Sequence, residues 1–312
     1  MKAHLLTVAA LALVAALMPP AQAADALSAR IQSVDAHRFA ALFEAGTVSA
    51  AALQAGYLDG AGLGVRVFTP HRIENAENLA QAVVARRADY AHAIRTCLPV
   101  LDELNAELRA VYLAYQGLLP EKPLPAVHVV FGAGNSGGTA SPAVQVIGLE
   151  VMCGQGTSVD SFRASMRSIF AHETVHSWQP APRVEPKDLL LDAALSEGVP
   201  DLLAALVTGR EPSPAREAWA RGREAEVWAR FQADRAAWLG GDKTAIRRWF
   251  GNAGAQIDGV PEGWPSELGY WVGMQIARAY VAQAKGARQA LRELIARRDP
   301  AALLKASGYA PR

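Results

Sequence analysis

The sequence predicts an α+β fold that is mainly α-helical, with a small β-hairpin or sheet directly before one long helix. Three observations favour this class: apolar residues keep helical spacing over most of the chain, residues 126–152 are rich in β-branched residues, and a later helix carries His-Glu-x-x-His. The chain has 312 residues, of which 51% are hydrophobic, so a substantial core is possible. We expect one domain over 24–312, with a helical part at 24–125 and a part that carries the chemistry at 126–312.

The first 23 residues have the pattern of a secretory signal peptide. Lys2 supplies a positive start, residues 5–17 are an uninterrupted apolar run, and Ala21-Gln22-Ala23 is a small-x-small cleavage site. The alternative, a membrane anchor, needs a longer apolar run. No cysteine follows the run as a lipid-attachment site, and no later segment has 18 uncharged apolar residues. We therefore expect an exported protein whose mature chain does not insert stably into a membrane. The alanine- and arginine-rich composition is typical of a bacterium with a GC-rich genome, so the expected location is periplasmic or secreted.

The charge balance bears on the class of partner, and the two cysteines bear on the redox state of the chain. The net charge is +1, from 31 basic and 30 acidic side chains, which indicates neither nucleic acid nor an anionic membrane surface as a partner. Cys97 and Cys153 either form one disulfide after export or remain two buried thiols, and the sequence leaves both open. Their separation does not resemble a zinc ribbon.

Helices are expected over most of the first 125 residues. Residues 35–46 and 48–60 have the pattern of short helices that end at a glycine. Residues 75–119 form a long helical region, and Pro99 is expected to kink or divide it into a helical pair.

The stretch from 126 to 152 changes to β character. Residues 126–134 and 144–152 are strand candidates, and the glycine-rich residues 135–143 between them are typical of a turn. We expect a hairpin whose free strand edge could hold an extended peptide. His128 in the first strand either lines the cleft or, more simply, has a structural role. Asn135, Gly137 and Gly138 are expected to serve turn geometry.

Helices are predicted again after residue 158. Their expected ranges are 159–178, 187–195, 196–208, 213–239, 266–284, 287–297 and 300–306. The fourth range is a charged helix with Trp219, Trp228, Phe231 and Trp238 on its apolar positions.

The motif that carries chemistry is His172-Glu173-x-x-His176, in the first of these helices. Two histidines four residues apart lie on one helix face, so both imidazoles can bind one metal ion. Glu173 is rotated by about 100° from the first histidine, and it reaches a water that the metal activates. The apolar residues before the motif turn this face inward, where a metal would remove the cost of burying unpaired polar groups. The alternative is an ordinary helix that carries the pattern by chance.

A third ligand is expected downstream, because zinc sites of this kind use three protein ligands. Glu197 fits that role, and we expect one Zn²⁺ per chain. Asp201 fits as the carboxylate that accepts the outer N–H of a zinc-bound histidine and fixes its tautomer. Pro200 lies between them, so we expect a helix that begins near Ser196 or is kinked at the proline.

Other side chains could complete the site. Tyr270, in Gly-Tyr-Trp-Val-Gly, is a candidate donor to the oxyanion, and the alternative is that it is a core aromatic. Trp178 and Gln179 follow the motif directly, and they could pack beside the metal.

With these residues in hand, the chain resembles a bacterial family of predicted zinc-dependent proteases related to the gliding-motility lipoprotein GldB. The resemblance rests on YLDG, FGAGNSGGTAS, IGLEVM, AHETVHSWQ, EGVPDLLA, ELGYWVGMQIA and LLKASGY, in this order along the chain. It implies a zincin-like fold and a gluzincin-like peptidase site, with His172, His176 and Glu197 as ligands and Glu173 as base. The family usually has alanine where this chain has Pro200.

The residues and the resemblance together predict an exported zinc metallopeptidase that acts on a peptide or protein substrate. Glu173 would act as general base and then pass the proton to the leaving amine. The alternative is a catalytically silent, metal-stabilised envelope-assembly or binding protein. An inactive relative is expected to lose Glu173 first, and its presence here favours the enzyme. A weaker third possibility is a zinc hydrolase for a non-peptide amide.

Overall fold

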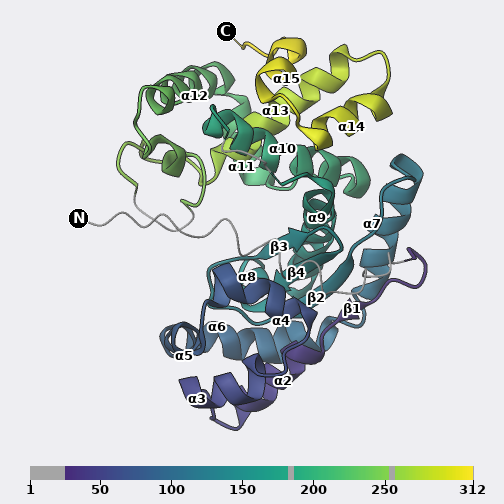
Figure 1. Cartoon of the computed structure of the whole chain (residues 1–312), viewed down its shortest axis with the longest axis vertical. Coiled ribbons are helices and arrows are strands. Elements are labelled where there is room, and N and C mark those ends of the chain that lie inside the picture. The colour runs from purple at the N-terminus through teal and green to yellow at the C-terminus, as the bar shows by residue number, and fades with distance from the viewer. Residues whose placement is uncertain (1–24, 182–185, 253–256, 312) are drawn as a thin grey trace.

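The computed structural model describes residues 25–181, 186–252 and 257–311. The predicted signal peptide, residues 1–23, lies outside the described residues. The molecule is elongated, with the N-terminal helices at one end, the C-terminal helices at the other, and helix α9 (Val159–Trp178) between them (Figure 1). Among the described helices, none combines the length and the apolar character needed to cross a membrane.

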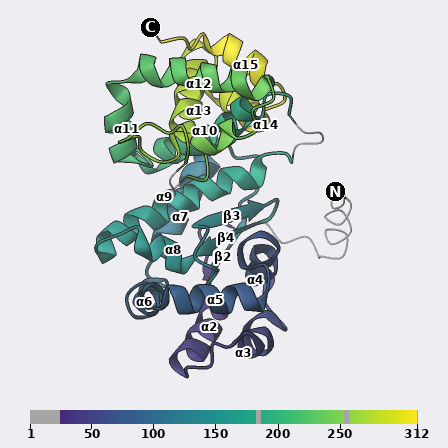
Figure 2. The same cartoon turned by 90° about the vertical axis from the view of Figure 1, so that its left-hand side faces the viewer.

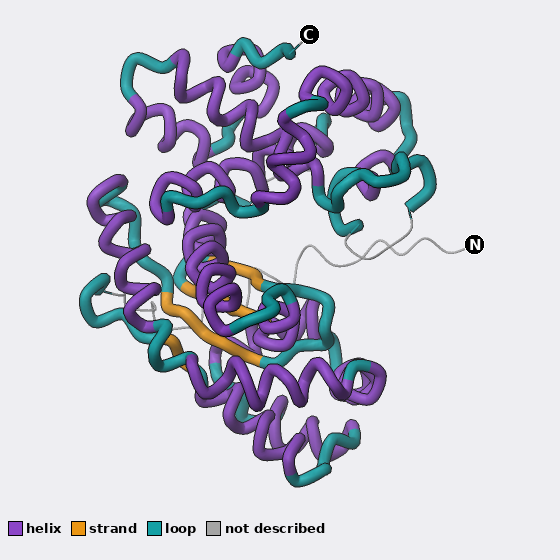
Figure 3. The backbone as a smooth tube through the Cα atoms, turned by 180° about the vertical axis from the view of Figure 1, so that it is seen from behind, coloured by secondary structure: helices purple, strands orange, loops and turns teal. Residues whose placement is uncertain are grey.

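A four-stranded sheet lies beside α9, seen as the orange segments in Figure 3. Its strands are β1 (Ile31–Gln32), β2 (Ala126–Val130), β3 (Gly138–Ser141) and β4 (Val144–Gly148). The order is β1-β2-β4-β3, so β3 is an edge strand. Strand β2 pairs in parallel with both β1 and β4, whereas β3 pairs antiparallel with β4. The fold is therefore α+β and mainly helical, as predicted.

The prediction that residues 126–134 and 144–152 form an antiparallel hairpin is wrong. The glycine-rich residues 135–143 are not only a turn, because they supply strand β3. Only Pro142 and Ala143 separate β3 from β4, so this tight turn makes β3 the antiparallel partner of β4. Strand β2 then pairs with the other edge of β4 in parallel. Residues 149–152, predicted as strand, belong to helix α8 (Leu149–Gly154).

Helices cover both faces of the sheet (Figure 2). Helices α2 (Val34–Glu44) and α4 (Leu63–Phe68) pack on one face, and α9 packs on the other. The remaining N-terminal helices are α3 (Ala50–Leu53), α5 (Ala76–Ala85), α6 (Arg87–His92) and α7 (Asn105–Leu118), with the shorter η2 (Gln54–Leu58), η3 (Thr69–Ile73), η4 (Ala93–Cys97) and η5 (Leu98–Val100) between them. Pro99 lies in η5 and divides the long helical region, as predicted.

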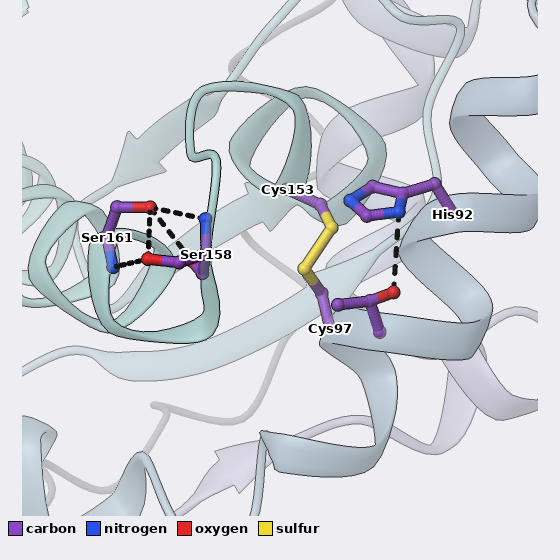
Figure 4. The surroundings of a disulfide bond; sticks show 6 residues. His92, Cys97, Cys153, Ser158 and Ser161 are labelled. Carbon is purple, nitrogen blue, oxygen red and sulfur yellow. Dashed lines mark hydrogen bonds between the residues drawn. A yellow bond between two sulfur atoms is a disulfide. The ribbon is translucent and has the colours of Figure 1, made fainter.

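Cys97 and Cys153 form a disulfide, with their Cα atoms 6.0 Å apart (Figure 4). The bond joins η4 to α8 across a sequence separation of 56 residues. Of the two alternatives that the sequence leaves open, the structure therefore has the disulfide. It ties the N-terminal helices to the segment that leads directly into α9.

The regular elements of the C-terminal half, within its described parts, are helices joined by loops. Its helices are α10 (Leu189–Thr208), α11 (Pro214–Arg221), α12 (Glu224–Leu239), η6 (Ala245–Arg248), α13 (Leu268–Gln283), α14 (Ala287–Ala296) and α15 (Pro300–Ser307). Two predictions need correction. The two helices predicted at 187–195 and 196–208 are one helix, α10, with Pro200 inside it. The single helix predicted at 213–239 is two helices, because α11 ends at Arg221 and α12 begins at Glu224.

Helices α10 and α13 cross at two glycines, Gly198 and Gly273. A Cβ on Gly273 would lie 1.7 Å from the oxygen of Ala194, and a Cβ on Gly198 would lie 2.2 Å from the backbone of Gly273. Backbone therefore contacts backbone at this crossing, which only glycine allows. The close contact brings α13 to the helix that carries Glu197 and Asp201.

Candidate metal centre

Three potential ligand atoms converge between α9 and α10. The Nε2 atoms of His172 and His176 are 2.9 Å apart. Glu197 Oε2 lies 3.3 Å from the first of these atoms and 3.1 Å from the second. Within the described ranges, these three residues form a group that could hold a metal ion. The structure thus brings together all three predicted ligands.

The outer nitrogens of the two imidazoles have fixed partners. His172 Nδ1 donates to Asp201 Oδ1 at 2.9 Å, and His176 Nδ1 donates to Gln179 Oε1 at 2.8 Å. With Nδ1 protonated in each ring, the lone pair of each Nε2 points into the space that Glu197 also faces. Three acceptor atoms this close together repel one another unless a proton or a metal ion lies between them. The donor set, two imidazoles and one carboxylate, suits zinc, and the edges of a zinc tetrahedron are about 3.3 Å long.

Asp201 is almost fully buried and joins His172 to Arg216 of α11. Its Oδ2 accepts from Arg216 Nη2 at 2.7 Å, and Arg216 also donates to the carbonyl oxygen of Glu267 at 3.3 Å. A buried carboxylate with two charge-assisted partners is held in one orientation. Asp201 therefore lies in the position predicted for it. Arg216 could not be identified from the sequence, because its contact with Asp201 depends on how α11 packs.

Gln179 supplies the hydrogen bond that Pro200 cannot make in α10. Because proline has no N–H, the carbonyl oxygen of Ser196 loses its helical partner. Gln179 Nε2 donates to that oxygen at 2.9 Å, while the Oε1 of the same side chain accepts from His176. The break in the α10 hydrogen-bond ladder is therefore filled by the residue that orients a ligand. The sequence predicted only that Gln179 packs near the metal. The structure shows hydrogen bonds from Gln179 to both His176 and Ser196.

Glu173 lies beside the ligands, facing the first residue of β3. A Cβ on Gly138 would lie 2.5 Å from Glu173 Oε1, so a larger residue would displace this carboxylate from its position. Gly138 was predicted to serve turn geometry, and it instead lies in the edge strand against Glu173. Glu173 Oε2 is buried and has no hydrogen-bond partner among the described residues. Such an unpaired polar atom is costly, and it is typical of a group that awaits a ligand or water.

The electrostatics of the cluster favour positive charge between the ligands. Burial by itself lowers the pKa of His172, but its bonds to Asp201 and Glu197 outweigh burial and raise that pKa well above its ordinary value. Burial also lowers the pKa of His176, but the negative charge of Glu197 and its hydrogen bond raise that pKa by more, so the net shift is upward. Burial raises the pKa of Glu197, yet the two imidazoles lower it far below its usual range. Burial raises the pKa of Glu173, and the imidazoles only partly oppose this effect.

Tyr270, the predicted oxyanion donor, lies against the cluster. Its ring stacks on that of His172, with centroids 6.0 Å apart and planes at 20°, and the guanidinium of Arg216 lies 5.2 Å from its centroid. Burial and the negative charge of Glu197 raise the pKa of the phenol, so it stays protonated and can donate. Its hydroxyl has no hydrogen-bond partner within the described part of the chain.

Trp178 and His128 make their described contacts outside the ligand cluster. Trp178 Nε1 donates to the carbonyl oxygen of Pro123 at 2.6 Å, and its ring packs against Tyr115, so it anchors α9 to the loop after α7. His128 is half-buried in β2 beside Gly64 of α4, and burial lowers its pKa. Neither belongs to the ligand cluster.

Residues 202–311 match the family described as gliding motility protein GldB. The matched region includes Arg216 and Tyr270, but it begins after Glu197 and so contains none of the three ligands. No curated protein matches the chain, and no solved structure matches it.

Proposed function

We propose that this protein is an exported zinc metallopeptidase with a zincin-like catalytic site. One observation carries the proposal: two imidazole nitrogens and a carboxylate oxygen lie within 3.3 Å of one another, beside a buried carboxylate with an unpaired oxygen. Three protein ligands with a neighbouring glutamate make the arrangement of a hydrolytic zinc site, not of a closed structural one. The predicted signal peptide supports a periplasmic or secreted location, and similarity to gliding motility protein GldB is compatible with an envelope role.

The chain's own residues divide the reaction between them. Zinc, when bound, would supply Lewis acidity to a water and to the carbonyl that is cleaved. Glu173 takes the proton from that water and gives it to the leaving amine, a role that suits a carboxylate whose pKa is raised by burial. Tyr270 donates to the developing oxyanion through a phenol that stays protonated. Asp201 and Gln179 hold the imidazoles in the tautomer with Nε2 free.

The free edge of β3 is the surface proposed to hold the substrate backbone. Gly148 N–H donates to the carbonyl oxygen of Gly137, so these two residues are a bonded pair of the β3–β4 ladder. Bonded pairs alternate in an antiparallel ladder, so the backbone groups of Gly138 and Ala140 point away from β4. The carbonyl oxygen of Gly138 already accepts from Ser136 Oγ at 2.7 Å, so its second lone pair, its N–H and the backbone groups of Ala140 are those left for a peptide. An extended peptide that pairs with them would pass directly by Glu173, because Gly138 contacts that side chain.

A second candidate is a catalytically silent envelope-assembly or binding protein that keeps the metal for stability. One observation favours it: the region similar to gliding motility protein GldB contains none of the metal ligands. The two candidates differ in the role of Glu173, which is the general base in a peptidase and has no catalytic role in a silent protein.

Metal content is the first test. Native mass spectrometry of residues 24–312 after zinc reconstitution should find one zinc per chain, and the His176→Ala variant should carry none. The Glu173→Gln variant should keep its zinc and lose at least about a thousandfold in peptide cleavage, the upper range for loss of a general base. Zinc in the wild type without cleavage of any peptide library would favour the silent protein. Absence of zinc would refute both candidates.

A further inference from the structure

Arg72 is a half-buried arginine in η3, next to the free edge of β3. Its Nη2 donates to Thr139 Oγ1 at 3.3 Å, and its carbonyl oxygen accepts from Asn135 Nδ2 at 3.0 Å. In the described ranges it forms no ion pair with an aspartate or glutamate. A guanidinium has five N–H donors, so most of them remain for another group.

The geometry of β3 defines which group that is. Side chains of neighbouring strand residues point to opposite faces, so Gly138 faces Glu173 and α9, whereas Thr139 faces the side of α4 and Arg72. Residues directly opposite each other on paired strands share a face. A peptide added to this edge would therefore place one side chain over Gly138 at the catalytic face. Its next residue, opposite Thr139, would point to Arg72.

The positive charge of Arg72 also acts on Glu173. Burial raises the pKa of Glu173, and Arg72 is among the positive groups that oppose this effect. A simpler interpretation is that Arg72 only balances Glu173. The two interpretations differ experimentally, because charge balance alone would affect all substrates equally.

We propose that Arg72 selects peptides with an acidic side chain at the position opposite Thr139, adjacent in sequence to the residue opposite Gly138 (an inference that rests on the proposed peptidase function). A carboxylate there would meet a planar donor group whose Nη2 is held by Thr139, on a backbone whose carbonyl oxygen is held by Asn135. Arginine forms stronger and more directional bonds to carboxylates than to neutral groups.

The test is a cleavage profile of residues 24–312 with zinc on a degenerate peptide library. One position near the cleaved bond should be enriched in Asp and Glu. Two peptides that differ only by Glu or Lys at that position should differ about ten- to hundredfold in kcat/KM, mainly through KM. Arg72→Glu should invert the preference, and Arg72→Lys should retain part of it. The matched control is Arg30→Glu, the same charge change at an exposed residue beside β1, the opposite edge of the sheet, and it should keep the wild-type profile.

Equal loss on both peptides in Arg72→Glu would overturn the inference and leave the peptidase proposal intact. If the wild type cleaves nothing, the proposed function fails, and binding then tests the inference separately. The Glu173→Gln variant is incubated with the same library on beads. Enrichment of acidic peptides that the added Arg72→Glu change removes would support acidic recognition, and binding without that enrichment would overturn it.

Discussion

At the scale of single residues, the site depends on partners that hold each ligand from behind. His172 is held by a hydrogen bond to Asp201, and Asp201 is held in turn by a hydrogen bond from Arg216. His176 is held by a hydrogen bond to Gln179. The same side chain donates to the carbonyl oxygen of Ser196, which Pro200 leaves without a helical partner in α10. These bonds define which ring nitrogen carries a proton, and metal affinity depends on that choice. The proline that interrupts the helix is therefore part of the ligand support.

The Gln179→Ala variant tests this support. It removes the bond to His176 Nδ1 and leaves the Ser196 carbonyl unpaired, so zinc affinity should fall about ten- to hundredfold. Chelator competition measures the change. Gln283→Ala, at the exposed end of α13, is the control and should bind zinc as the wild type does. An unchanged affinity for Gln179→Ala would mean that His176 is oriented by helix geometry alone.

Glu150 predicts a pH dependence of stability that is separate from the metal site. It is buried and accepts from the backbone N–H groups of Gly132 and Gly134, and burial raises its pKa to about 7, against those bonds and the charge of Arg86. Between pH 4.5, its ordinary pKa, and about 7, the folded chain keeps a proton that the unfolded chain has lost. The free energy of unfolding should therefore fall by roughly 3 kcal/mol as pH rises through this window, and then level off.

Urea unfolding of the wild type and of Glu150→Gln, compared from pH 4 to pH 8, measures this contribution. The difference between the two chains should change with pH across the window, because glutamine does not titrate there. Parallel curves would show that Glu150 binds its proton equally in both states.

At the scale of elements, the crossing of α10 and α13 positions the third ligand and Tyr270 together. Gly198 and Gly273 let the two helix backbones touch. Tyr270 lies three residues before Gly273, on the same side of α13, and its ring therefore reaches His172. The edge strand β3 is positioned in the same way, since Gly138 allows it to lie against Glu173.

The Gly273→Ala variant should disrupt this crossing. Its Cβ would lie 1.7 Å from the oxygen of Ala194, so α13 must move away from α10, at a cost on the order of 3 kcal/mol in unfolding free energy. Gly117→Ala is the matched control, because a Cβ there meets nothing within 4 Å in helix α7. The control should be stabilised by about 0.5–1 kcal/mol. Equal stabilities for the two variants, in chemical denaturation, would contradict the close crossing.

At the scale of the whole molecule, α9 connects the two halves. Its N-terminal part packs near the disulfide-bonded α8, one face lies on the sheet, and its C-terminal part carries the ligands that face α10. The candidate site therefore lies where the sheet of the N-terminal half meets the helices of the C-terminal half (Figure 1).

Removal of the disulfide should destabilise the chain as a whole. The bond closes a loop across 56 residues, for which the loss of chain entropy in the unfolded state corresponds to about 4 kcal/mol. The Cys97→Ala/Cys153→Ala variant should therefore unfold at a lower urea concentration, while its zinc content stays at that of the wild type. Loss of zinc in the folded variant would mean that the disulfide also positions α9.

The sequence by itself determined the mainly helical α+β class, the bounds of α9 and the residues of the candidate cluster. Helical periodicity and the spacing of His172, Glu173 and His176 are local properties, and residues four apart on a helix share a face in any context. Glu197 and Asp201 could be named for the same reason, because their spacing from each other is also helical.

Only the tertiary structure decided the rest. The pairing of β3 with β4, the continuity of α10 through Pro200, and the contacts of Arg216, Gln179 and Arg72 all join residues that are distant in sequence or depend on such contacts. The disulfide was one of two open possibilities until the fold brought Cys97 to Cys153. Local pattern cannot define such partners, because they depend on how whole elements pack against one another.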